Sequence, residues 1–356
     1  MIQARIRKSL SREGDTPAFA MEIDFSASGA VTCVFGPPAS GKTLLLDLLS
    51  GLSQPGDGRI LLGEQIVFDS ASGIHLPPRR RPCGYVFPAP ALVPHLTLRQ
   101  NLLFAALCRK APRLERHRKV EESIERFELT GAAARLPGAV SASDRLRCAV
   151  ARALISEPKL LLVDEPSPEH MSREELMEAL RRIKAEGAPA ILYATRRLED
   201  CLELGGGMLV LESGRLLQDG PCREVLEQPA GAEAARLIGG FNLLPVSIAA
   251  LDPVRNSSRL RLGEADLTGP YFPGHLRGDR VTLCVRYGDL RTVPASGKPG
   301  PNQLRLPLMR VSEDRQAVRL HFEGGITAEM PLAAYREQSH VRNWLVEFPA
   351  DCLRVL

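Results

Sequence analysis

No stretch of the sequence is apolar enough to span a membrane, and neither sign of charge dominates it. A transmembrane helix needs roughly 20 consecutive apolar residues, and every apolar run in this chain is shorter. We therefore do not expect the chain to cross a bilayer unaided. The formal net charge of +4 over 356 residues is small and does not favour nucleic acid as a partner. The arginine run 79–81 is expected to be a solvated face.

The eight cysteines show no pairing along the sequence. They are scattered without C-x-x-C spacing, which argues against both a zinc site and a disulfide framework. We expect reduced structural thiols. The first residues alternate apolar and polar side chains as a strand does, and they lack the apolar core of a secretory signal. Together these features predict a cytoplasmic location.

The length predicts two domains, because 356 residues exceed what one hydrophobic core usually serves. Between residues 31 and 210, apolar strand-like runs alternate with helix-period segments. This pattern is typical of a mainly parallel sheet covered by helices. The clearest strands are 31–35, 160–163 and 190–194. Helices are expected near 96–108, 115–127 and 143–155, where they form an inserted lobe.

After residues 239–240 the pattern changes to short alternating strands separated by turns. The clearest of these strands are 259–262, 281–285 and 317–322. We predict an α/β domain over residues 1–240 and a small all-β, OB-like domain over residues 241–356. The turn-rich segment 294–301 suggests that the β region comprises two related halves.

Residues 36–43 match the phosphate-binding pattern G-x-x-x-x-G-K-[ST] between an expected strand and an expected helix. The residues are Gly36, Pro37, Pro38, Ala39, Ser40, Gly41, Lys42 and Thr43. Glycines let main-chain N–H groups face the phosphates, the lysine reaches the β- and γ-phosphate oxygens, and the threonine coordinates magnesium. The prolines each remove one N–H. The motif predicts ATP and Mg²⁺ as ligands, and a chance glycine-rich turn is a much weaker interpretation in this context.

Two carboxylates follow the expected strand 160–163. Asp164 and Glu165 come at the C-terminal edge of a buried strand, where ligands of open α/β sheets bind. We expect Asp164 to hold the metal together with Thr43, and Glu165 to orient or deprotonate the attacking water. An acidic turn after a strand is common by itself. In order with the phosphate loop, the pair predicts nucleotide hydrolysis.

With these motifs in order, the chain resembles the ATP-binding subunits of ABC transporters, and specifically those of molybdate importers. Segments 79–87 and 93–102 look like that family's strand and following segment, and residues 149–154 resemble the helix after its signature. The resemblance implies a P-loop NTPase fold. It also implies a head-to-tail dimer, in which ATP lies between one phosphate loop and the partner's signature, and membrane permease subunits that hold the chain at the inner face of the cell membrane.

The expected C-terminal domain resembles the accessory domain of these importers. Segments 302–304 and 318–325 look like its molybdate-binding repeat. Residues 299–301 are Pro-Gly-Pro, however, where the repeat normally carries a hydroxyl and a cation that an oxyanion would use. Two interpretations stay open: an oxyanion bound at this domain, and a β module that serves only dimerisation or packing.

The signature of this chain, residues 140–144, departs from the family pattern. Ser141 is retained, but both glycines are replaced. Glycine best lets a backbone press its N–H groups against a γ-phosphate, so the replacements are expected to weaken the dimer sandwich. Ser141 and Asp144 still predict a capping box at the start of a helix.

Three further elements depart from the family. Pro88 replaces a glutamine that touches magnesium and water, and residues 167–171 lack the usual aspartate. Arg196 takes the place of the switch histidine. An arginine can pair with a γ-phosphate but cannot accept a hydrogen bond as a neutral imidazole can.

The leading prediction is an importer subunit that binds and hydrolyses Mg-ATP, working as a dimer of identical chains or with another ABC subunit. Four altered elements make a pseudo-ATPase, which binds ATP without efficient hydrolysis, the main alternative. The phosphate loop, Asp164 and Glu165 are intact, which favours activity. A P-loop enzyme without any permease is a third interpretation.

Overall fold

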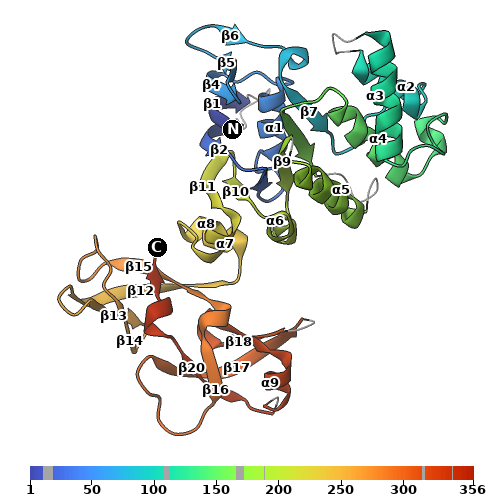
Figure 1. The fold of residues 1–356 in the computed structure, drawn as a ribbon. Helices are drawn as coiled ribbons and strands as arrows, with labels where there is room; N and C mark the ends of the chain where they lie inside the picture. The colour runs from blue at the N-terminus through green and yellow to red at the C-terminus, as the bar shows by residue number, and fades with distance from the viewer. Residues whose placement is uncertain (11–18, 108–111, 166–171, 188, 315–316, 339) are drawn as a thin grey trace. The chain divides into compact units, whose positions relative to one another are not determined.

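The computed structural model describes residues 1–10, 19–107, 112–165, 172–187, 189–314, 317–338 and 340–356. It divides into two compact units, Met1–Gln228 and Pro229–Leu356 (Figure 1). This division falls before helix α8 (Ala232–Ile238), which contacts strands of the second unit. The boundary expected from the sequence, at residue 240, falls after that helix. Each unit is described by itself.

The first unit is built around a mixed eleven-stranded sheet. Five neighbouring strands, in the order β10, β3, β9, β8 and β7, are parallel to one another. The strands are β1 (Ile2–Leu10), β2 (Phe19–Ala27), β3 (Val31–Phe35), β4 (Asp57–Leu62), β5 (Gln65–Asp69), β6 (Ile74–His75), β7 (Cys83–Val86), β8 (Leu160–Asp164), β9 (Ala190–Thr195), β10 (Gly207–Glu212) and β11 (Arg215–Pro221). The three strands predicted most clearly are thus confirmed as β3, β8 and β9.

The helices of the first unit are α1 (Lys42–Ser50), α2 (Leu98–Ala106), α3 (Arg113–Arg126), α4 (Ala142–Leu154), α5 (Arg173–Ala185), α6 (Leu198–Leu204) and α7 (Cys222–Glu227). Helices α2, α3 and α4 pack on one another around their own apolar cluster and form the predicted helical lobe (Figure 1). Each begins and ends within about two residues of the predicted range.

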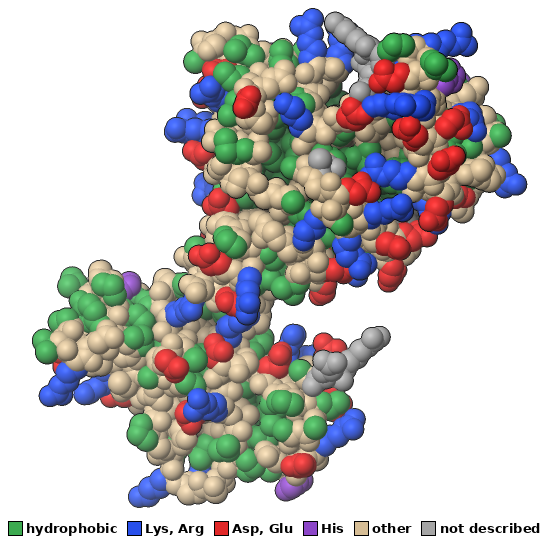
Figure 2. All heavy atoms as spheres, viewed as in Figure 1, with side chains coloured by type: hydrophobic (Ala, Val, Ile, Leu, Met, Phe, Trp, Pro, Cys, Tyr) green, Lys and Arg blue, Asp and Glu red, His purple; other side chains and the backbone are tan. Residues whose placement is uncertain are grey.

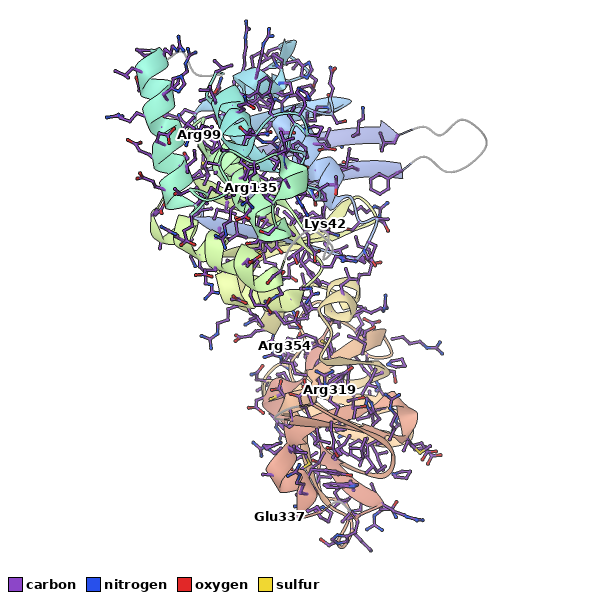
Figure 3. All side chains as sticks on the ribbon, turned by 90° about the vertical axis from the view of Figure 1, so that its right-hand side faces the viewer. Lys42, Arg99, Arg135, Arg319, Glu337 and Arg354 are labelled. Carbon is purple, nitrogen blue, oxygen red and sulfur yellow. The ribbon has the colours of Figure 1, made fainter. Side chains whose placement is uncertain are left out.

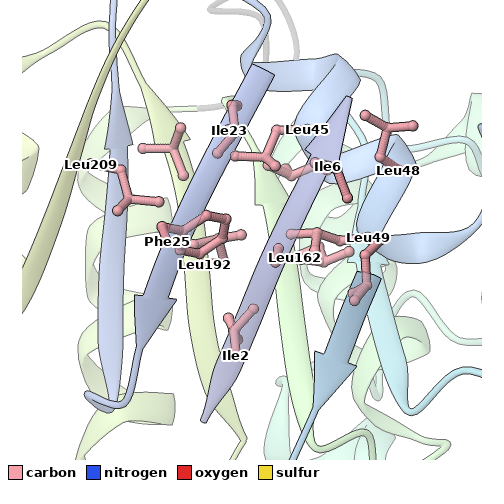
Figure 4. Packing of buried hydrophobic residues seen from close by; sticks show 14 of the residues in the cluster. Ile2, Ile6, Ile23, Phe25, Leu45, Leu48, Leu49, Leu162, Leu192 and Leu209 are labelled. Atoms are coloured by element: carbon pink, nitrogen blue, oxygen red, sulfur yellow. The ribbon is translucent and has the colours of Figure 1, made fainter. Parts of the chain in front are cut away.

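The main core lies between α1 and the sheet. Figure 4 shows Leu45, Leu48 and Leu49 of α1 beside strand residues such as Ile6 and Leu162. All five residues of β3 and of β8 are buried, which is expected for parallel strands covered by helices. This burial anchors the phosphate loop, because the loop leaves β3 at one end and enters α1 at the other.

Arg81 corrects one expectation. Arg79 and Arg80 are exposed as predicted, but Arg81 is buried, with 5% of its surface accessible. Its Nη1 donates to the carbonyls of Leu48 at 2.7 Å and Leu49 at 2.8 Å, at the C-terminal end of α1. A cation there satisfies carbonyls that the helix leaves unpaired and complements the helix dipole. The solvated face was therefore the wrong interpretation for this arginine.

The second unit contains two five-stranded antiparallel sheets, in the orders β14-β13-β12-β15-β21 and β16-β20-β17-β18-β19. The strands are β12 (Phe241–Asp252), β13 (Ser257–Leu262), β14 (Ala265–Pro270), β15 (Arg280–Arg286), β16 (Arg291–Pro294), β17 (Gln303–Glu313), β18 (Ala317–Phe322), β19 (Thr327–Pro331), β20 (Asn343–Glu347) and β21 (Arg354–Val355). Short helices α8 and α9 (Leu332–Arg336) accompany them. Residues 295–302 connect β16 to β17.

The two sheets repeat one arrangement and exchange a strand. Strand β16 follows the first four strands in sequence but joins the sheet of β17 to β20, whereas β21 follows those and joins the sheet of β12 to β15. The long strands β12 and β17 both carry a register shift, at Ile248 and at Leu308. This topology bears out the two related halves that the turn-rich connector suggested.

Reciprocal asparagines join the two halves. The side chain of Asn302 accepts from Thr268 N at 2.7 Å and donates to Thr268 O at 2.7 Å and to Phe348 O at 2.9 Å. In the other half, Asn242 accepts from Thr327 N at 2.7 Å and donates to Thr327 O at 2.8 Å. Each asparagine therefore pairs with the main chain of the opposite half, as a strand would.

Charged side chains of both signs are interspersed over the visible face in Figure 2, in line with the small net charge. Within the described ranges, no helix is long and apolar enough to cross a membrane, and no group of three or more His, Cys, Asp or Glu side chains could hold a metal ion. Seven cysteines lie in these ranges and all are free thiols; Cys108 lies outside them.

Candidate active site

The phosphate loop turns tightly between β3 and α1, and two glycines make the turn feasible. A Cβ at Gly36 would lie 2.3 Å from the carbonyl oxygen of Leu211. Gly41 has φ of 102°, in the region that favours glycine, and a Cβ there would lie 2.6 Å from the Met21 methyl carbon and 3.1 Å from the Phe19 ring. Close packing as well as the tight turn therefore requires glycine at these two positions.

Lys42, labelled in Figure 3, turns its ammonium back onto the phosphate loop. It donates to Gly36 O at 2.8 Å, to Pro37 O at 2.7 Å and to Ser40 Oγ at 3.3 Å. Burial lowers the pKa of Lys42, and the charges of Glu165 and Asp164 oppose that shift. These carboxylates help keep the ammonium charged, as a phosphate-binding lysine requires.

The remaining loop residues shape the turn. Pro37 contributes its carbonyl, which accepts from Ser40 N at 3.3 Å as well as from Lys42. Pro38 and Ala39 are exposed at the tip, and Ala39 has φ of 61°. Ser40 is buried, and its carbonyl accepts from Gly214 N at 2.9 Å. The prolines are thus accommodated in the turn, and the Pro37 carbonyl helps to hold it by accepting two hydrogen bonds.

Thr43 and Asp164 lie together as predicted. The Thr43 hydroxyl donates to Asp164 Oδ2 at 2.8 Å. Burial raises the pKa of Asp164, while the hydrogen bond from Thr43 opposes the shift. The two side chains offer hard oxygen donors beside the phosphate loop, and Mg²⁺ prefers one or two such protein ligands together with phosphate oxygens and water. The pair therefore fits a magnesium ion.

Glu165 lies next to both Lys42 and the segment after β9. Its Oε2 accepts from the main-chain N of Arg196 at 3.0 Å and from Arg196 Nε at 3.2 Å. Arg197 Nε lies 3.9 Å from Glu165 Oε1. The structure thus brings five predicted residues to one place: Lys42, Thr43, Asp164, Glu165 and Arg196.

Ser141 does not belong to this cluster. It is the N-cap of α4 in the helical lobe, where its Oγ accepts from Asp144 N at 3.0 Å and donates to Asp144 Oδ2 at 2.7 Å. The predicted cap is confirmed, although the carboxylate returns to the serine hydroxyl instead of its main-chain N–H. A role for Ser141 at a nucleotide therefore requires a second subunit.

Comparison with known proteins identifies the family. Residues 21–168 match the model described as ABC transporter. The molybdenum import ATP-binding protein ModC of Brucella melitensis biotype 1 is 33% identical over 280 residues, which cover 78% of this chain and 75% of ModC. The molybdate/tungstate import ATP-binding protein WtpC of Pyrococcus horikoshii is 34% identical over 253 residues, which cover 70% of this chain and 69% of WtpC. The chain belongs to the ABC transporter ATP-binding family.

Solved structures agree on the ABC fold. A dimeric ATP-binding cassette in a post-hydrolysis state, bound to ADP and phosphate, matches with a TM-score of 0.52 and 21% identity over 63% of this chain and 99% of that chain. The protein cbiO1 from Clostridium perfringens matches with a TM-score of 0.52 and 23% identity over 66% of this chain and 94% of that chain. These likenesses confirm the predicted ABC ATPase fold.

Family membership makes this chain an ATP-binding and ATP-hydrolysing subunit. Nothing in the comparisons supports the pseudo-ATPase alternative. Segment 167–171, which lacks the family's usual aspartate, lies outside the described residues. Phe19 packs against the phosphate loop and the core.

Asp200 is a buried carboxylate near this site that was not predicted from the sequence. Its Oδ2 accepts from Tyr193 Oη at 2.9 Å and from Thr195 Oγ1 at 2.8 Å, and its Oδ1 accepts from Arg173 Nε at 2.6 Å. These hydrogen bonds connect helices α5 and α6 to Thr195, which directly precedes Arg196. An aspartate on the apolar face of a short amphipathic helix was the available signal.

Proposed function

We propose that this chain is the ATPase subunit of an importer for molybdate or a related oxyanion. The observation that carries the proposal is the meeting of Lys42, the Thr43–Asp164 pair and Glu165 at one phosphate loop, in a chain whose relatives are named for molybdenum and molybdate/tungstate import. A further relative, CysA of Thermosynechococcus vestitus, is named for sulfate/thiosulfate import and is 37% identical over 221 residues. The solute class is thus a tetrahedral oxyanion.

In this proposal the phosphate loop, residues 36–43, binds the β- and γ-phosphates through its N–H groups and Lys42. Thr43 and Asp164 hold the magnesium ion, which when bound neutralises charge on the phosphate oxygens. Glu165 accepts a proton from the attacking water or orients it. Glu165 is suited to this role because Arg196 orients the carboxylate through two hydrogen bonds to a single oxygen, Oε2.

ATP-binding subunits of ABC importers dimerise and work with membrane permease subunits. We propose a head-to-tail dimer, in which Ser141 of one subunit faces the γ-phosphate bound by the other, and in which Arg196 also reaches that phosphate. The partner is an identical chain or another ABC subunit. Binding to the permease would place the chain at the cytoplasmic face of the membrane, with the helical lobe as the docking region.

The oxyanion site that the resemblance suggested for the second unit gains no donor from Asn302, because its amide is already bonded to main chain of residues 268 and 348. We keep an oxyanion at this unit as a proposal only. Titration of the whole chain with molybdate, in the absence of ATP, tests it. Heat of binding would support the site, and none would leave the unit with a role in dimerisation or packing.

Transport assays test the proposed function. The chain is expressed with its permease subunits and binding protein in membrane vesicles, and uptake of molybdate, tungstate and sulfate is measured with ATP inside or outside. We expect oxyanion uptake that needs ATP on the cytoplasmic side and that Lys42→Ala abolishes. Uptake that is unchanged by Lys42→Ala would contradict the proposal.

A further inference from the structure

The segment 87–93, which connects β7 to the approach to α2, adopts a conformation that its surroundings must hold. Ala91 has φ of 47°, in the left-handed region that residues other than glycine rarely occupy. Pro88 and Pro90 restrict the preceding backbone. Such a conformation persists only where neighbouring groups determine it, so the contacts of this segment are informative.

Arg152 of α4 holds the middle of the segment. Its Nη1 donates to Ala91 O at 2.7 Å, and its Nη2 donates to Pro90 O at 3.1 Å. The arginine is half-buried, and burial lowers its pKa. A partly buried cation requires hydrogen bonds, and here two consecutive carbonyls supply them. Two parallel bonds fix the orientation of the peptide as well as its position.

The segment is anchored at its two ends as well. At the α2 end, Asn101 is fully buried, and its Oδ1 accepts from Val93 N at 2.8 Å. At the β7 end, Tyr85 Oη donates to Asp47 Oδ1 of α1 at 3.1 Å. The Tyr85 ring stacks on Phe87 with ring centroids 4.1 Å apart.

These contacts form a continuous link between two helices that face ATP in the proposed dimer. One end is α1, whose first turn carries Lys42 and Thr43. The other end is α4, whose N-cap is Ser141. Because each bound ATP would contact α1 of one subunit and α4 of the other, the spacing of α1 and α4 within a subunit decides whether both sites can close together.

We propose that Arg152 is a positioning residue for ATP hydrolysis. By fixing the peptides of residues 90 and 91 against α4, it sets the position of α4 relative to α1. Arg152 makes this connection through the main-chain carbonyls of Pro90 and Ala91. Pro88, which stands where the family has a glutamine, has no polar side-chain group that could take part. The inference rests on the proposed function and assigns Arg152 no contact with ATP.

The test compares Arg152→Ala with wild type in ATP affinity and in the maximal rate of phosphate release. Because Lys42 and Thr43 are untouched, we expect ATP affinity of the nucleotide-free chain to change less than about threefold. We expect the maximal rate to fall at least about tenfold. Arg152→Lys, which can replace one of the two bonds, should recover part of the rate. Arg147→Ala, on the same helix but paired with Glu128 at the surface, should behave as wild type.

Ala91→Gly separates positioning from stability. Glycine adopts the positive φ freely, so this variant should melt no lower than wild type and yet lose part of the maximal rate, because the segment is less constrained. A variant that melts as wild type and also hydrolyses as wild type would overturn the proposal, as would full activity of Arg152→Ala.

Hydrogen exchange of the nucleotide-free chain gives a readout independent of hydrolysis. We expect the amides of residues 89, 91, 92 and 93 to exchange faster in Arg152→Ala than in wild type or Arg147→Ala. Unchanged exchange would show that Arg152 does not hold this segment, and it would overturn the proposal even if hydrolysis fell. If wild-type protein released no phosphate while exchange changed as expected, the proposed function would fail. Arg152 would still hold residues 90 and 91, but its role in hydrolysis would be refuted.

Discussion

Arg196 holds one oxygen of Glu165 with two donors, its main-chain N–H at 3.0 Å and its Nε at 3.2 Å. Both bonds go to Oε2, and Arg197 Nε lies 3.9 Å from Oε1. The glutamate is therefore oriented before any nucleotide binds, with Oε2 carrying both hydrogen bonds and Oε1 only the more distant Arg197. Arg196, which replaces the family's histidine, thus orients Glu165 through direct hydrogen bonds.

The first prediction separates the two contacts proposed for Arg196. The guanidinium can reach a γ-phosphate, which ATP has and ADP lacks. A charge-assisted hydrogen bond contributes about 1.5–3 kcal/mol, so Arg196→Ala should weaken ATP binding about tenfold or more and leave ADP binding nearly unchanged. Titration calorimetry with both nucleotides checks this. Arg197→Ala is the matched control, and an equal loss for ATP and ADP would refute the γ-phosphate contact.

The second prediction concerns Asp164 and pH. Burial raises the pKa of Asp164 in the folded chain above its unfolded value, so the folded chain holds this proton more tightly. Its contribution to stability is therefore greatest at low pH and is lost as pH rises through the folded-state pKa. At pH 7 the ionised carboxylate destabilises the nucleotide-free protein.

Asp164→Asn should accordingly raise the melting temperature at pH 7, by about 2–4 °C for each ~1 kcal/mol gained, and the gain should shrink as pH falls toward 3.8. The same variant should lose magnesium-dependent hydrolysis. Asp57→Asn is the control, and its melting temperature should not rise at pH 7. A hydrogen bond from Ser70 lowers the pKa of Asp57, so its ionised carboxylate stabilises the folded chain. Equal melting of wild type and Asp164→Asn at every pH would contradict the assignment.

The third prediction tests the buried arginine at the end of α1. Removing Arg81 would leave the carbonyls of Leu48 and Leu49 without their side-chain donor. We expect Arg81→Ala to lower the free energy of unfolding by about 2–4 kcal/mol, measured by urea denaturation. Exposed Arg79→Ala should change it by less than about 0.5 kcal/mol. Similar values for the two variants would show that Arg81 is not buried in solution.

The fourth prediction concerns the second unit. If Asn242 and Asn302 join its halves, Asn242→Ala should leave buried main-chain groups of Thr327 unpaired, at about 1–3 kcal/mol each. Asn302→Ala should cost less, because its bonds to Thr268 are exposed. Exposed Asn343→Ala is the control. Scanning calorimetry should show a lower transition for the second unit in both asparagine variants and an unchanged one for the control. A transition that moves in neither variant would argue against the reciprocal pairing.

The sequence was sufficient for the phosphate loop because that motif is local. A buried strand, a glycine-rich turn and a helix follow one another without interruption, and Lys42 and Thr43 take their places from the turn itself. The contact between Thr43 and Asp164 could also be expected, because parallel strands bring their carboxyl ends to one edge.

Other features depend on packing between distant segments. Arg81 belongs to a basic run that looked solvated, and only the position of α1 explains its burial. Arg152 and the reciprocal asparagines bond to main-chain groups, which leave no trace in side-chain patterns. Tyr193 and Thr195 of strand β9 and Arg173 of helix α5 converge on the buried Asp200 of helix α6. Such contacts follow from the fold and not from local sequence.

The most direct test of this account is phosphate release by the purified chain in Mg-ATP, measured beside Lys42→Ala and Glu165→Gln, with exposed Lys159→Ala as the control. We predict turnover in wild type and Lys159→Ala, no turnover in Lys42→Ala because ATP is not held, and no turnover in Glu165→Gln although ATP is bound and a dimer forms. Turnover by Glu165→Gln equal to that of wild type, or ATP binding without turnover in wild type, would contradict the assignment of an active ATPase with Glu165 as its base.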